Sequence, residues 1–99
     1  MNKKRTDVHL IIRRAWELDK IRLSKFHGKL RSNQRKIGTM EIRDVILYGE
    51  REAEADSYKG THWLYAIRNK DIDGSDIRIL FDIESYPDVV IVTLMHVYP

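Results

Sequence analysis

The sequence predicts an α+β domain in which two or three N-terminal helices pack on a three- to four-stranded antiparallel sheet. Two observations support this prediction. Up to Gly49, apolar residues recur at spacings of three and four, which is typical of helices with one buried face. After Gly49, runs rich in β-branched and aromatic residues are separated by turn signals, which is typical of strands. Helices followed by strands in this order favour the α+β class.

The first expected helix begins at Thr6 or Asp7, either of which can cap a helix N-terminus. Its apolar residues follow a three-four rhythm along the sequence "VHLIIRRAWELD". Ile21–Leu23 are expected to form a short extended link. A second helix is predicted from Ser24, a suitable N-cap, to about Lys36.

Gly38 can end the second helix, because glycine is common just after a helix C-terminus. The third expected helix has the sequence "MEIRDVILYG", with Thr39 as its cap and Gly49 at its end. Its buried stripe consists of Ile42, Val45 and Ile46.

Three segments of the second half are predicted strands: "THWLYAIR", "DIRILFDI" and "VVIVTLMHVY". Asp73-Gly74 marks a turn between the first two, and "ESYPD" separates the last two. The segment "EREAEADSY" is expected to be a short edge strand, with a continuation of helix as the alternative.

Alternation along the middle strand predicts one buried and one solvated face. Ile77, Ile79, Phe81 and Ile83 point one way, and their neighbours Arg78, Leu80, Asp82 and Glu84 point the other. The last strand is apolar on both faces, which predicts a central position in the sheet.

Composition favours one soluble domain over residues 1–99. The chain is 42% hydrophobic and 33% charged and contains no cysteine, which excludes disulfides and thiolate chemistry and fits a reducing compartment. No apolar run approaches the ~20 residues that span a bilayer, and "LII" near the start is too short for a signal peptide. We therefore expect a cytoplasmic protein without a membrane partner.

Charge is distributed unevenly. Residues 1–50 contain 13 Lys or Arg and 6 Asp or Glu, whereas residues 51–99 contain 5 and 9. A basic half beside an acidic half suggests a polyanionic partner for the first half. An ordinary solvated helical surface is the alternative interpretation.

One row of side chains stands out in the basic half. His27, Arg31 and Arg35 are four residues apart, so that on a helix they share one face. Helical geometry alone leaves two interpretations open: a phosphate-handling surface, or the solvated side of a helix.

The row is followed by Ile37 and Thr39, then by a short helix that ends in Gly49-Glu50, and the chain finishes with the strand "VVIVTL". This arrangement resembles a family of small bacterial domains of unknown function. Its pattern is His-x3-Arg-x3-Arg-x-Ile/Leu-Ser/Thr, a helix ending in Gly-Glu, and a final strand of the type Ile-Ile/Val-Thr-Val. The resemblance covers residues 23–98, which leaves residues 1–20 as an extra N-terminal helix.

Such domains are similar to the RelE/ParE-like toxins and other small ribonucleases with helices packed on an antiparallel sheet. The resemblance therefore implies a RelE-like core and a metal-independent endoribonuclease of toxin type. It also implies an acidic, antitoxin-like protein that covers the basic face. Fold likeness does not fix function, so a non-catalytic module that binds nucleic acid or protein is the alternative.

The residue types suit RNA cleavage without a metal. The 2′-hydroxyl attacks the neighbouring phosphate, and the reaction needs a base, an acid and positive charge on the phosphate oxygens. His27 can transfer protons, and Arg31 and Arg35 can grip phosphate. Arg78 and Thr93 are expected to complete the site from the sheet.

The other histidines have more ordinary interpretations. His9 is expected at the surface or in packing. His62 is expected to be a solvated strand-end residue, with a site at the end of the sheet as the alternative. His96 is expected to be structural, although the resemblance to the toxins leaves a catalytic role near the chain end as the alternative. The four histidines lack the spacing of metal ligands, so we expect no metal site and no cofactor.

Asp82 and Glu84 are expected to be solvated, or paired with Lys or Arg across the strands. Trp63 or Tyr65 is expected to fill the core rather than to stack on bases.

An oligomer built through the N-terminal helix is a further expectation. Ile12 and Trp16 would dock on a symmetry mate, or instead close the domain's own core.

Overall fold

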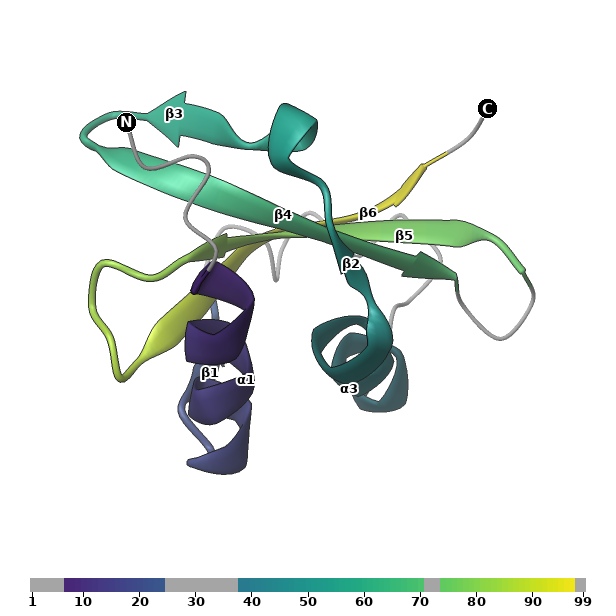
Figure 1. Cartoon of the computed structure of the whole chain (residues 1–99), viewed down its shortest axis with the longest axis horizontal. Helices are drawn as coiled ribbons and strands as arrows, with labels where there is room; N and C mark the ends of the chain where they lie inside the picture. The colour runs from purple at the N-terminus through teal and green to yellow at the C-terminus, as the bar shows by residue number, and fades with distance from the viewer. Residues whose placement is uncertain (1–6, 25–37, 71–73, 98–99) are drawn as a thin grey trace.

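The computed structural model describes residues 7–24, 38–70 and 74–97. In this part of the chain, two α-helices lie on one side of a six-stranded mixed sheet (Figure 1). The helices are α1 (Val8–Glu17) and α3 (Thr39–Tyr48). The strands are β1 (Ile21–Leu23), β2 (Glu50–Arg51), β3 (Ser57–Lys59), β4 (His62–Lys70), β5 (Asp76–Asp82) and β6 (Val89–Val97). The predicted α+β class is confirmed.

The sheet has the order β1-β6-β5-β4-β2, and β3 also pairs with β4. Strands β4, β5 and β6 form the expected antiparallel meander. β6 lies between β5 and β1, which agrees with the central position that its two apolar faces predict. A shift of register interrupts the pairing of β5 with β6 between Leu80 and Phe81.

The predicted number of three to four strands was too low for the described residues, and the sheet is mixed because one of the additional strands runs parallel to its neighbour. Ile21–Leu23, expected as a link, form β1, which runs parallel to β6 with Ile21 opposite Val89. The expected edge strand "EREAEADSY" is divided into β2, a 3-10 turn η3 (Ala53–Ala55) and β3. These strands are only two or three residues long, so their pairing depends on tertiary contacts that periodicity does not report. The predicted helix from Ser24 to Lys36 lies outside the described residues except for Ser24, whose backbone N–H donates to the carbonyl of Ile91 at 3.0 Å.

The core lies between the helices and the inner face of the sheet. On α1, Val8, Ile12 and Ala15 have no exposed surface, so this helix is an integral part of the core. From β5, Ile77, Ile79 and Phe81 face the helices and are fully buried. Their fellow core residues are Ile42, Val45, Ile46, Tyr65, Ile67, Ile83, Val89, Ile91 and Leu94.

Both residues considered above for an oligomer contact pack in this core. Ile12 is fully buried and Trp16 packs against the same cluster. Tyr65 is 3% exposed and Trp63 also packs there, as expected for core aromatics. The apolar stripe of α1 therefore closes the domain's own core.

The C-terminus of α1 is held by a Schellman motif. The backbone N–H of Asp19 donates to the carbonyl of Trp16 at 3.1 Å, and that of Lys20 donates to the carbonyl of Ala15 at 2.8 Å. This motif requires a left-handed residue, and Asp19 has φ 61°. The turn sends the chain directly into β1.

The unpaired backbone groups at the two ends of α3 find their hydrogen-bond partners in different ways. At its start, the backbone N–H of Gly38 donates to Oε1 of Glu41 at 2.9 Å, so Gly38 and not Thr39 is the N-cap. At its end, His9 Nε2 donates to the carbonyl oxygen of Ile46 at 2.7 Å. Arg13 Nη2 donates to that of Leu47 at 3.2 Å. Residues of α1 thus cap the C-terminus of α3.

In the described ranges, no helix is both long enough and apolar enough to cross a membrane.

Candidate functional site

The outer face of the sheet, opposite α1 and α3, carries the chemically active side chains of β4, β5 and β6. Residues alternate between the two faces of a strand. Since Ile77, Ile79 and Phe81 face the helices, Arg78, Leu80 and Asp82 lie on the outer face. Register places on the same face His62, Leu64, Ala66, Arg68, Lys70, Asp76, Thr93, Met95 and Val97.

The structure brings together two of the five predicted site residues. Arg78 is paired with Met95 and Thr93 with Leu80, so Arg78 and Thr93 are diagonal neighbours on the outer face. Such neighbours are roughly 7–8 Å apart in antiparallel sheets. The prediction that Arg78 lies on the solvated side of its strand is confirmed. His27, Arg31 and Arg35 lie outside the described residues.

Arg78 belongs to a charged network that sequence reasoning missed. Its Nε and Nη2 donate to the two carboxylate oxygens of Glu52 at 2.8 and 2.9 Å. Arg68, directly opposite Arg78 on β4, donates to Glu52 at 3.1 Å and also to Asp76. Lys70 completes the network, 2.9 Å from Asp76. Two facing cations would repel each other, and the carboxylates between them remove that penalty.

The network shifts the acidic pKa values downward. The hydrogen bond from Arg78, followed by that from Arg68, holds the pKa of Glu52 below its ordinary value. Hydrogen bonds from Arg68 and then Lys70 lower the pKa of Asp76 in the same way. These carboxylates therefore stay charged, and they balance most of the positive charge of Arg68 and Arg78.

Glu52 reaches the network because of the turn between β2 and β3. Arg51 pairs bidentately with Asp56 at 3.0 and 2.8 Å, and the Asp56 side chain is only 1% exposed. Asp56 Oδ1 also accepts the backbone N–H of Ala66 at 2.8 Å, where the β-ladder is interrupted by η3. This buried carboxylate fixes the turn. No sequence pattern indicated this role.

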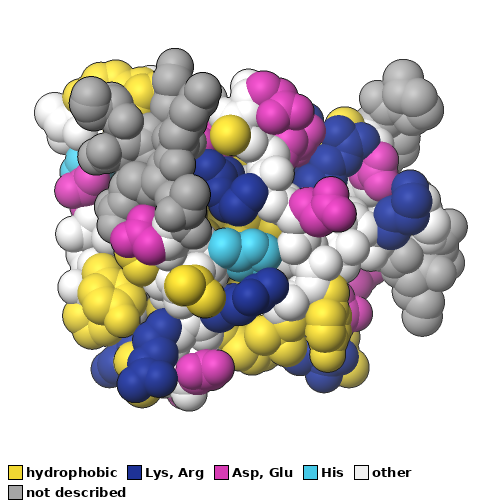
Figure 2. All heavy atoms as spheres, in the orientation of Figure 1, with side chains coloured by type: hydrophobic (Ala, Val, Ile, Leu, Met, Phe, Trp, Pro, Cys, Tyr) yellow, Lys and Arg dark blue, Asp and Glu magenta, His cyan; other side chains and the backbone are white. Residues whose placement is uncertain are grey.

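A polar hollow of about 400 Å³ lies at the β2 edge beside the network. It is lined by Tyr48, Glu50, Arg51, Glu52, Glu54, Arg68, Asn69, Lys70 and Asp76. Four acidic and three basic side chains line it, and Figure 2 shows both kinds intermixed on the visible face of the molecule. The hollow thus offers no single-sign surface for a polyanion.

A histidine–carboxylate pair occupies the other end of the outer face. His62 Nδ1 lies 2.7 Å from Asp82 Oδ2, across β4 and β5. Asp82 Oδ1 accepts the backbone N–H of Glu84 at 2.9 Å. Asp82 is therefore paired across the strands as expected, but with a histidine instead of Lys or Arg. His62 and Asp82 are 20 residues apart, so only the register of β4 and β5 reveals their contact.

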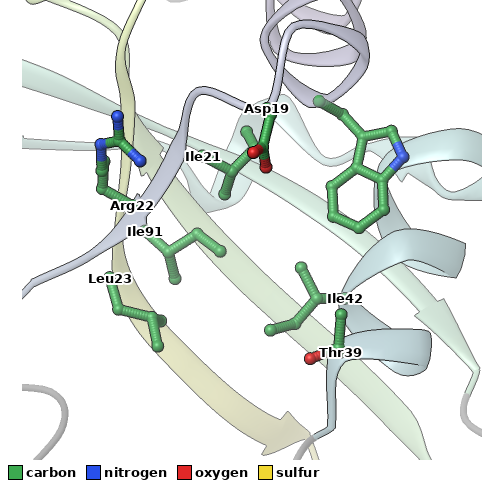
Figure 3. A pocket seen from close by; sticks show the side chains of 8 residues that line it. Asp19, Ile21, Arg22, Leu23, Thr39, Ile42 and Ile91 are labelled. Atoms are coloured by element: carbon green, nitrogen blue, oxygen red, sulfur yellow. The ribbon is translucent and has the colours of Figure 1, made fainter.

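An apolar pocket of about 270 Å³ lies between α1, β1, β6 and α3 (Figure 3). Ile21, Leu23, Ile42 and Ile91 line it, together with Trp16, and Asp19, Arg22 and Thr39 add polar groups. None of the predicted site residues with a described position lines this pocket. The outer face is therefore the better candidate for a chemical site.

Comparison with known proteins gives one family. Residues 25–96 match the family model described as "Domain of unknown function (DUF4258)". The match supports the expected domain family of unknown function; the RelE/ParE likeness and the His-Arg-Arg motif are not part of it and stay predictions. No match was found among curated proteins or among solved structures. Since the match to the family model covers well over half of the chain, this protein belongs to the family described as "Domain of unknown function (DUF4258)".

Proposed function

We propose that this protein is a metal-independent endoribonuclease of toxin type. The observation that carries the proposal is the row of His27, Arg31 and Arg35, which lies inside the family-matched stretch. Residues 25–37 contain five Lys or Arg and no acidic residue. A histidine beside several fixed cations supplies a proton-transfer group and the positive charge that RNA cleavage by the 2′-hydroxyl requires.

In this proposal His27 transfers a proton, and Arg31 and Arg35 bind the non-bridging phosphate oxygens. Arg78 and Thr93 contribute from the outer face of the sheet. Arg78 uses Nε and Nη2 for Glu52, which fixes the guanidinium plane and leaves Nη1 for a phosphate oxygen. The Thr93 hydroxyl can donate a further hydrogen bond.

The distribution of charge supports a polyanionic substrate. The described residues contain 10 Lys or Arg and 13 Asp or Glu, although the whole chain carries a net charge of +3. The positive excess therefore belongs to residues 1–6 and 25–37. RNA, or an acidic antitoxin-like protein, would be attracted to these basic stretches.

A non-catalytic binding module is the alternative function. It is favoured by the pairing of Arg68 and Arg78 with Glu52 and Asp76, because these arginines then serve the sheet and not a substrate. Such a module would bind nucleic acid or protein through the basic stretch of residues 25–37.

The test is a cleavage assay with total RNA in EDTA. Wild-type protein should produce fragments, His27→Ala should produce none, and Arg14→Ala should behave as wild type. Arg14 is a matched control because it is an exposed arginine on α1, 63% accessible and paired only with Glu17 in the described contacts.

The same variants distinguish the binding module. A binding module would bind RNA without cleaving it, and its binding would weaken steeply with salt. Binding should then survive His27→Ala and be lost in Arg31→Ala and Arg35→Ala. This combination of results would contradict the ribonuclease and support the binding module.

A further inference from the structure

The pair of His62 and Asp82 has the arrangement of an oriented proton-transfer group. Leu64 lies opposite Asp82 in the ladder, so His62 is the diagonal neighbour of Asp82 on the outer face. The Nδ1–Oδ2 distance of 2.7 Å is that of a strong, charge-assisted hydrogen bond. With Nδ1 engaged, Nε2 is the ring nitrogen left for another partner.

The carboxylate is itself held in place. Asp82 Oδ1 accepts the backbone N–H of Glu84 at 2.9 Å, while Oδ2 binds the imidazole. Asp82 is 20% exposed and His62 is 43% exposed, so the supporting carboxylate is the more buried of the two and the imidazole reaches solvent. A base oriented by a third, fixed group is the geometry expected of a catalytic histidine.

The groups around His62 favour its protonated form. The hydrogen bond to Asp82 raises the pKa of His62, burial partly opposes this effect, and the negative charges of Asp82 and Glu84 reinforce it. From β3, the residue paired with His62 is Lys59. At neutral pH the imidazole therefore carries a proton more often than a free histidine does.

We propose that His62 is the general acid of RNA cleavage by this protein and that Asp82 is its positioning residue. The inference rests on the proposed ribonuclease function and adds a residue to that site. By register, His62 and Asp82 share the outer face with Arg78 and Thr93, with the buried Leu64 and Ala66 between the two pairs. All four side chains are assigned by this inference to one bound RNA strand.

The step balances as a transesterification. The 2′-oxygen forms a bond to phosphorus and gives its proton to the base, and the bond from phosphorus to the 5′-oxygen breaks. His62 Nε2 gives its proton to that leaving 5′-oxygen. The products are a 2′,3′-cyclic phosphate and a 5′-hydroxyl end. The neutral imidazole keeps Nδ1–H donated to Asp82, and solvent returns a proton to Nε2.

The decisive experiment compares two RNA oligonucleotides in EDTA: an ordinary one, and one with sulfur in place of the bridging 5′-oxygen at the cleavage site. A thiolate leaves without protonation, so it needs no general acid. His62→Gln should cleave the ordinary RNA about 100-fold more slowly than wild type. It should cleave the sulfur-containing RNA at nearly the wild-type rate. Arg14→Ala is the control on both substrates.

Asp82→Asn tests the positioning role. The alkaline limb of the pH–rate profile should move to lower pH, because the imidazole loses its carboxylate partner. The pKa of His62, followed by NMR, should fall by the same amount. A purely structural cross-strand pair would leave the position of this limb unchanged.

The outcomes separate the two proposals. If wild type cleaves RNA and His62→Gln is equally active, or is equally slow on both substrates, the general-acid role is wrong and the ribonuclease stands. If folded wild type cleaves neither substrate at any pH, the ribonuclease function and the role of His62 both fail.

Discussion

At the scale of single residues, Gly49 shows how a short motif can have a steric cause. Gly49 is buried at the point where α3 meets β4. A Cβ added here would collide with the carbonyl oxygen of Val45, and would lie 2.8 Å from Ile67 Cγ2 and 2.9 Å from the carbonyl oxygen of Arg68. The Gly-Glu ending of this helix is therefore explained by close packing of backbone on backbone.

Gly49→Ala should destabilise the protein, because two of the three colliding atoms are backbone and have little room to move. We expect a loss of about 1–3 kcal/mol, which for a domain of this size lowers the melting temperature by roughly 4–8 °C per kcal/mol. The measurement is thermal unfolding followed by circular dichroism.

Gly38→Ala is the matched control for this prediction. The nearest atom to its added Cβ is Glu41 Oε1 at 3.9 Å, so the substitution should cost much less. Equal melting temperatures of the two variants would contradict the steric explanation.

Two histidines should give the stability opposite pH dependences. Burial, and then the nearby Arg13 and Arg51, lower the pKa of His9 against the opposing effect of its hydrogen bond to Ile46. The unfolded state then binds the proton more tightly than the folded state. The contribution of His9 to the free energy of unfolding is therefore present above pH 6.5 and is lost as the pH falls through the pKa of His9 in the folded state.

The pKa of His62 is raised, chiefly by Asp82, so the sign is reversed. The contribution of His62 to the free energy of unfolding is present below pH 6.5 and is lost as the pH rises through the pKa of His62 in the folded state. Together the two histidines favour a stability maximum near pH 6.5.

Urea unfolding of wild type, His9→Gln and His62→Gln between pH 5 and 8 checks both signs. His62→Gln should remove the decline on the alkaline side, and His9→Gln should remove the decline on the acid side. The interpretation is wrong if either variant keeps the slope that its histidine is meant to cause.

At the scale of elements, α1 and α3 depend on each other through their polar groups as well as through their apolar faces. The final carbonyls of a helix lack partners within it and attract positive charge. Arg13 donates to the carbonyl oxygens of Ile46 at 3.4 Å and Leu47 at 3.2 Å, and His9 donates to that of Ile46. The end of α3 is therefore completed by a different helix.

Arg13→Met keeps the length of the side chain but removes these hydrogen bonds and the charge. We expect a loss of about 1–2 kcal/mol in the free energy of unfolding, measured in urea. The comparison variant is Arg14→Met, on the next residue of α1 but in an exposed pair with Glu17 at 3.6 Å. It should cost less than about 0.5 kcal/mol. Similar losses for both variants would mean that the cap does not contribute.

At the scale of the whole molecule, the fold extends beyond the family-matched stretch. The match covers residues 25–96, whereas Val8, Ile12 and Ala15 of α1 are fully buried and β1 pairs with β6. Burying each Val or Ile side chain contributes about 1.5–3 kcal/mol, against a total stability of about 5–15 kcal/mol for a typical protein. The N-terminal segment therefore supplies a large part of the stability.

A protein of residues 25–99 should consequently fail to fold. We expect loss of the cooperative thermal transition and poor dispersion in its NMR spectrum, whereas a protein of residues 7–99 should keep both. A cooperative transition in the 25–99 protein would show that α1 and β1 are additions to a self-sufficient core.

The sequence predicted α1, α3 and the three long strands because each has its own repeating apolar pattern. It also placed Arg78 on the solvated face, since strand alternation is a local property. The pairing of His62 with Asp82, and of Arg78 with Glu52, was not predictable in this way. Each pair joins residues 20 or more positions apart whose contact depends on which strands become neighbours.

The α+β class, the long elements, the faces of the middle strand and the uneven distribution of charge could thus be predicted from the sequence. The mixed sheet, the burial of α1 in the common core and the polar contacts of the outer face became visible only in the folded chain. The difference lies in the range of the interactions. Helix and strand patterns arise within a few residues, whereas β1, Glu52 and Asp82 acquire their partners only when distant segments pack together.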